Sequence, residues 1–216
     1  MKSEIDFNTI LTIATNVGYI IAGVVISYFI VKKKLNEYFN DIKSNLNVGS
    51  KIPKQSKTDM EIVKRMEQVK EILNADRVLV YEFHNGEHYA NGRSALKFSC
   101  TYEVYRTGIE SVQNKLSSVP ISCVPKFISK LLEEEFIKET DVEHIRDKMP
   151  ATYGLSRDIN ITSYQNLVIK NGKGEPVGFL AVHWCNGQKM TYNDKELYRL
   201  GAFIEERIII ESDKKK

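Results

Sequence analysis

The sequence predicts an α+β protein in which a transmembrane helix precedes one domain of strands and helices. Three observations lead to this prediction. Residues 10–31 form an uncharged apolar run, residues 77–84 and 165–184 have strand patterns, and amphipathic helical patterns flank these strands. The 216 residues are 42% hydrophobic and 27% charged, as is typical of a chain with a folded core.

Residues 10–31 are long enough to cross a membrane as a helix. The run has 22 residues without a charge. At about 1.5 Å per residue it would cover about 33 Å, against a hydrocarbon core of about 30 Å. A cleaved signal peptide is the alternative, but its apolar stretch is shorter and ends at a small-residue cleavage site, whereas Lys32, Lys33 and Lys34 follow this run. We therefore expect an uncleaved anchor behind a short flank, 1–9.

The charges beside this run predict its orientation. Residues 32–57 contain seven lysines and two acidic residues, whereas the N-terminal flank has one lysine. Positive charge stays on the cytoplasmic side, so we expect a single-pass protein of the inner (cytoplasmic) membrane with its C-terminal domain in the cytoplasm. The chain has an odd number of cysteines at irregular spacing: Cys100, Cys123 and Cys185. This pattern is typical of reduced thiols and not of a disulfide framework. The net charge of +3 is too small to indicate a nucleic-acid partner.

Residues 32–57 are predicted to form a basic juxtamembrane helix and a linker. Apolar residues at helical spacing indicate the helix, and a glycine and a proline between 47 and 57 indicate the linker. Thr58, with Glu61 three residues later, forms a capping box at the start of the domain. We expect the domain to cover 58–211, followed by a charged tail, 212–216.

The elements of the domain follow from periodicity and turn chemistry. Strands are expected where β-branched and aromatic residues alternate with polar ones, and helices where apolar residues recur one turn apart. Asn-Gly pairs at 85–86 and 91–92 indicate a polar loop. The expected order is a helix to about residue 74, strands 77–84 and 96–103, helices 125–136 and 141–149, a hairpin of 165–170 and 176–184, and a last helix over about 193–211.

This order of elements resembles a GAF domain, a relative of PAS. The residues that carry the resemblance are Tyr153-Gly154-Leu155-Ser156, then QNLVIKNGKGEPVGFLAVHW, with Gly178 as the hairpin glycine, then LYRLGAFIEERI in the last helix. The chain departs from the family at 158–163, where a short apolar strand is usual. The segment FHNGEHYANGRSALKFSCTYE is also similar to membrane-anchored GAF-like proteins of bacteriophages.

The resemblance implies a GAF-like antiparallel sheet with helices packed on one face and a small-molecule pocket on the other. It also implies that the first and last helices of the domain pair across a homodimer, and the apolar seams of both helices suit such pairing. The alternative is that these seams cover the sheet of a monomer. We expect a homodimer.

Five residues are candidates for binding a ligand: Glu82, His84, Arg93, Cys100 and His183. The first and last strands of a GAF-like sheet are neighbours, so we expect Glu82, His84 and His183 to meet at one mouth of the pocket. Two imidazoles and an arginine would suit an anionic or nucleobase-like ligand. The alternative is that these residues belong to a polar sheet surface and a loop.

Metal and thiol chemistry have candidate residues as well. His84, His88, His183 and Cys185 are ligand types that metals accept, but the first two flank an Asn-Gly turn, so we expect no metal. Some GAF-fold proteins reduce free methionine sulfoxide with paired cysteines, but the surroundings of the cysteines here do not match theirs. The sequence contains no GxSxG or HExxH motif, and we expect no catalytic residue.

We therefore expect a non-enzymatic, membrane-tethered cytoplasmic sensor or adaptor that binds a small ligand or a protein partner. No cofactor is identified by the sequence. One alternative is a structural membrane tether or recruitment protein with a vestigial pocket, which a phage could encode. Another alternative is a thiol-dependent GAF-fold enzyme. A single span joined to a folded domain of this size argues against a pore.

Overall fold

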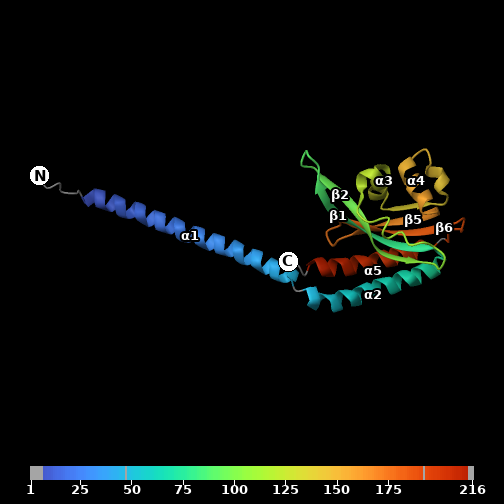
Figure 1. The fold of residues 1–216 in the computed structure, drawn as a ribbon, viewed down its shortest axis with the longest axis horizontal. Coiled ribbons are helices and arrows are strands. Elements are labelled where there is room, and N and C mark those ends of the chain that lie inside the picture. Colours follow the sequence, from blue (N-terminus) through green and yellow to red (C-terminus); the bar gives the residue numbers. More distant parts are fainter. Residues whose placement is uncertain (1–6, 47, 192, 214–216) are drawn as a thin grey trace. The chain divides into compact units, whose positions relative to one another are not determined.

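The computed structural model describes the backbone of residues 7–46, 48–191 and 193–213 (Figure 1). Within these helices, the side chains at 7–14, 17, 20, 41, 43–46, 48, 50 and 208–213 lie outside the described residues. The chain divides into two compact units, Met1–Ser56 and Lys57–Lys216.

The first unit contains one long helix, α1 (Phe7–Leu46). Its apolar side chains are exposed, for example Val24 at 64% and Phe29 at 62%. In the part of the chain that the structure describes, no helix has both the length and the apolar character of a membrane span. The predicted span, 10–31, includes residues 10–14, 17 and 20, whose side chains lie outside the described residues.

Helix α2 (Val48–Ile72) starts ten residues before the predicted N-cap, Thr58. The predicted linker is therefore wrong from residue 48 onward. Pro53 lies inside this helix, where it removes one backbone donor and its ring crowds the carbonyl one turn earlier. From Ile62 onward the helix presents an apolar seam to the sheet, formed by Ile62, Met66, Val69 and Leu73, all buried.

A six-stranded antiparallel sheet forms the centre of the second unit, with strand order β3-β2-β1-β6-β5-β4. The strands are β1 (Arg77–His88), β2 (Ser94–Tyr105), β3 (Val119–Pro120), β4 (Phe136–Glu139), β5 (Ile161–Lys170) and β6 (Pro176–Cys185). The predicted hairpin of β5 and β6 is confirmed, and β1 and β6 are neighbours.

Helices cover both faces of this sheet, whereas the sequence predicted helices on one face (Figure 1). Helix α2 and helix α5 (Asp194–Asp213) pack on one face over a core that includes Trp184. The other face is covered by α3 (Pro125–Glu134), α4 (Pro150–Asp158) and the short 3-10 helices η1 (Ile121–Cys123) and η2 (Val142–Ile145). This second face carries aromatic residues, and the apolar sides of α3 and α4 pack on them and bury them.

Three local predictions differ from the structure. The predicted helix 125–136 ends at Glu134, and strand β4 begins at Phe136. Helix α4 occupies residues for which no helix was predicted, and Pro150 stands at its first position. Strand β1 continues through the Asn85-Gly86 pair, where a loop was predicted, because the strands approach closely there: a Cβ on Gly86 would lie 2.2 Å from the carbonyl oxygen of Ala95.

Gly178 allows the two central strands to approach each other. It lies opposite Glu82 in the pairing of β6 with β1, and a Cβ at this position would lie 2.0 Å from the carbonyl oxygen of Tyr81. Backbone cannot move aside as a flexible side chain can, so any larger residue would push the central strands apart. The hairpin glycine of the resemblance thus has a packing reason.

We expect Gly178→Ala to lower the free energy of unfolding by about 2 kcal/mol or more, because the added methyl group overlaps backbone. Urea unfolding of the full chain in one detergent, followed by circular dichroism, measures this. Gly154→Ala is the matched control: no atom lies within 4 Å of its Cβ position, and alanine favours the helix by up to about 1 kcal/mol. Equal losses in the two variants would contradict the packing argument.

Candidate functional site

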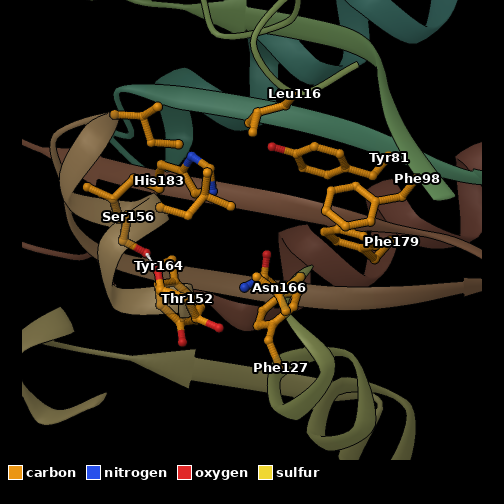
Figure 2. A pocket seen from close by; sticks show the side chains of 14 residues that line it. Tyr81, Phe98, Leu116, Phe127, Thr152, Ser156, Tyr164, Asn166, Phe179 and His183 are labelled. Carbon is orange, nitrogen blue, oxygen red and sulfur yellow. Dashed lines mark hydrogen bonds between the residues drawn. The ribbon is translucent and has the colours of Figure 1, made fainter. Parts of the chain in front are cut away.

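A cavity of about 60 Å³ lies between the sheet and the elements that cover its second face (Figure 2). Most of its wall is apolar and includes Phe98, Phe127 and Phe179. A space of this size is large enough for water or a small ligand. Its polar lining comes from Tyr81, Thr152, Ser156, Tyr164, Asn166 and His183.

The floor of the cavity is set by the register of β5 and β6. Phe179, Ala181 and His183 project from the same face of β6, since successive side chains of a strand alternate. The side chain of Ala181 is only a methyl group, so it leaves space between the Phe179 ring and the His183 imidazole. Asn166 lies opposite Ala181 on β5, and Figure 2 shows its amide directed into the cavity.

Helix α4 contributes the polar part of the cover. Thr152 and Ser156 are both buried, and the Ser156 hydroxyl donates to the Thr152 carbonyl oxygen at 2.8 Å. Leu155 and Ser156 belong to the short motif on which the GAF resemblance rests. That motif therefore lies at the cavity, although the helix around it was not predicted.

Tyr81 joins the aromatic wall to the polar lining. Its ring stacks on Phe179 with centroids 4.5 Å apart and meets Phe98 edge-on at 5.6 Å. Burial is the main reason that the pKa of the Tyr81 hydroxyl lies well above its usual value. The hydroxyl is therefore a neutral hydrogen-bond donor at the cavity.

His183 is a buried titratable side chain that lines the cavity. Its exposed fraction is 5%, and its Nδ1 has no hydrogen-bond partner among the described residues. Burial, and then the neighbouring positive charge of Arg77, lower its pKa from 6.5 to about 3. The imidazole is therefore neutral at physiological pH and has one donor and one acceptor nitrogen.

Arg77, on β1, lies opposite His183. Its guanidinium binds other parts of the fold and does not line the cavity. The guanidinium donates to the carbonyl oxygens of Ile159 and Glu110, each at 3.0 Å, and lies 3.8 Å from the buried carboxylate of Glu103. That carboxylate also accepts from the backbone N–H of Val112 at 3.0 Å. These bonds hold the loop between β2 and β3, and Leu116 of this loop lines the cavity.

The predicted site residues are not all at the cavity. His183 lines it, and Cys100 is buried in the apolar core beside it. The prediction that Glu82 and His84 meet His183 is wrong. In the pairing of β1 with β6, Glu82 lies opposite Gly178, five residues or about 17 Å from His183.

Glu82 and His84 also lie on the other sheet face. Tyr81 and Phe83 belong to the core on the cavity side, so the residues that alternate with them face away from it. His84 Nε2 is 2.9 Å from a serine hydroxyl of β2, and the Arg93 guanidinium lies over the ring of Tyr89 at 5.0 Å. The two imidazoles and the arginine predicted to bind an anion thus do not converge.

The three cysteines differ in environment. Burial raises the pKa of Cys100 to about 12 and that of Cys185 to about 11, which disfavours the reactive thiolate at both. Cys123 is exposed on η1. Among the described residues, no three His, Cys, Asp or Glu side chains are grouped to hold a metal ion.

Sequence reasoning missed Asn166 and the hydroxyl residues of α4. Asn166 is 3% exposed and follows the buried Gln165, and two adjacent polar residues before the apolar Leu167 in a predicted strand are a detectable signal. Thr152 and Ser156 gave a weaker signal, because they became cavity residues only through the placement of α4 over the sheet.

Comparison with known proteins gives a fold and no family. No protein-family model matches the chain, and no curated protein matches it. Solved structures do match: the blue-light absorbing form of the PixJ GAF domain from Thermosynechococcus elongatus has a TM-score of 0.53 at 14% identity, covering 74% of this chain and 91% of that one.

Two further structures agree. The photoproduct state of a GAF domain from Synechocystis has a TM-score of 0.51 at 16% identity, with 72% and 98% coverage. A GAF domain/HD domain protein from Geobacter sulfurreducens has a TM-score of 0.50 at 14% identity, with 72% and 92% coverage. The second unit therefore has the GAF fold, as the order of elements predicted.

The lowered pKa of His183 predicts a loss of stability in acid. Below pH 6.5 the unfolded chain binds a proton at this imidazole, whereas the folded chain does not until about pH 3, so stability falls as the pH falls through this window. Relative to His183→Gln, the wild-type chain should lose about 2 kcal/mol of unfolding free energy between pH 7 and pH 5. Urea titrations at both pH values test this, and parallel losses would contradict it.

Proposed function

We propose that this chain is a membrane-tethered, non-enzymatic sensor or adaptor whose GAF-fold domain binds a small ligand. The observation that carries this proposal is the cavity. It combines aromatic walls with the neutral imidazole of His183 and the amide of Asn166, and α3 and α4 cover it. A concave, mostly apolar space with a few converging polar groups is the usual form of a small-molecule site.

The fold comparison supports a sensory role by analogy. The similar structures include cyanobacteriochromes, one of which is described as a far-red photoreceptor. A fold hosts many functions, so the proposal rests on the cavity. The raised pKa values of Cys100 and Cys185 support a binding role over thiol catalysis.

The tether is proposed from the sequence of α1 and from its exposed side chains. Residues 10–31 carry no charge and are followed by three lysines. Tyr19, Val24 and Phe29 are each more than 60% exposed. Moving apolar surface of this extent from water into lipid is favourable. The lysines orient the GAF-fold unit toward the cytoplasm in this proposal.

A protein partner, including a second copy, remains part of the adaptor proposal. The helix seams from which a homodimer was predicted are buried against the sheet of the same chain, for example at Met66 and Leu200. This favours the monomeric use of those seams. A dimer would use other surfaces of α2 and α5, where Met60 is 70% and Tyr198 is 50% exposed.

We expect the full chain to stay in membranes washed with alkaline carbonate. Such a wash releases proteins held at the surface by charge, but it does not extract a helix that spans the bilayer. Deleting 10–31 should release the chain into the supernatant. The matched control replaces 10–31 with 22 alternating leucines and alanines and should stay in the pellet. Release of the unaltered chain by the wash would exclude the tether.

We expect native mass spectra of the full chain, released from detergent, to show a non-covalent added mass. Asn166→Leu should remove this mass, because it keeps the side-chain volume and loses the amide at the cavity. His84→Leu is the control and should keep it, since His84 faces away from the cavity. A clean mass for the unaltered chain would favour the structural tether with a vestigial pocket.

A further inference from the structure

We infer that the cavity selects a small uncharged ligand, with a polar end that both donates and accepts hydrogen bonds and an apolar remainder. This inference rests on the proposed sensor function and narrows its ligand. It replaces the anionic or nucleobase-like ligand that the sequence suggested.

The charge of the lining is the first reason. No Asp, Glu, Lys or Arg lines the cavity among the described residues. The nearest guanidinium, that of Arg77, already donates to two backbone carbonyls and is balanced by the Glu103 carboxylate. An entering carboxylate or ammonium group would lose its water and gain no counter-charge, so both ions are disfavoured.

The polar groups define the complementary end of the ligand. The His183 imidazole has a ring nitrogen without a partner among the described residues, and it is neutral, with one donor and one acceptor. The Asn166 amide also offers both roles, and the Tyr81 hydroxyl is neutral. A ligand that only accepts or only donates would leave some of these groups unsatisfied, whereas a primary amide satisfies both kinds.

The walls and the volume define the rest. Tyr81 and Phe179 stack on each other and present ring surfaces to the cavity, which suits a short hydrocarbon group. At about 60 Å³ the space favours a small ligand over one as large as a nucleobase. A short-chain amide or similar neutral molecule fits on both counts.

Three small molecules of nearly equal size test the charge directly: propionamide, propionate and propylammonium. Benzamide tests the size limit. The readout is the imidazole ¹⁵N signal of His183 in the full chain, labelled at its four histidines and held in detergent micelles. His183→Leu identifies the signal by its loss, and the signal of His84 in the same spectrum is the internal control.

Propionamide should shift the His183 signal saturably and leave His84 unchanged. Propionate, propylammonium and benzamide should bind at least about tenfold more weakly. Asn166→Leu should weaken propionamide at least about fivefold, whereas His84→Leu should not change its affinity.

Other results separate this inference from the proposed function. Propionate or propylammonium binding as tightly as propionamide would overturn the charge selection, and tighter benzamide would overturn the size limit; the sensor function would stand in each case. No shift with any of the four up to about 50 mM would overturn the inference. In that case, a co-purified ligand seen in the native mass spectrum and lost in Asn166→Leu would still support the sensor function. A spectrum of the unaltered chain without added mass would contradict the sensor function too.

Discussion

The buried guanidinium of Arg77 is the group on which the cavity side of the domain depends. Its side chain and that of Glu103 are 2% and 1% exposed, and burying such charges is tolerated only when they are paired and hydrogen-bonded. The two carbonyls that Arg77 holds belong to the loop before β3 and to the end of α4. One side chain of the central strand thus joins both parts of the cavity cover, and losing one partner of such a pair typically costs about 3–5 kcal/mol.

The same arginine decides the chemistry next to it. Because Arg77 lies opposite His183 on the neighbouring strand, its charge and the surrounding burial both keep the imidazole neutral. Its own donors point to backbone oxygens and to Glu103, which leaves the cavity without a cation among the described residues. With a neutral imidazole and no charged residue in its lining among the described residues, the proposed site suits neutral molecules.

The two faces of the sheet separate two tasks. The face under α2 and α5 is filled by aliphatic residues and Trp184, which leaves no need for a second chain to cover it. The cavity face has aromatic rings, a short residue at Ala181 and covers that are short helices and loops. In the proposed function, stability and recognition thus belong to opposite sides of one sheet, and Gly178 keeps its two central strands close.

The sequence alone determined the GAF fold, the β5–β6 hairpin and the seams of α2 and α5, because alternation, helical spacing and turn glycines are local signals. It placed His183 among the candidate residues and missed Asn166. Tertiary structure decided that Glu82 and His84 lie far from His183, since register and face depend on pairing between distant strands. It also decided that α4 covers the cavity and that Arg77 turns away from it, because where a buried charge finds its partners depends on segments about 30 to 80 residues away in the chain.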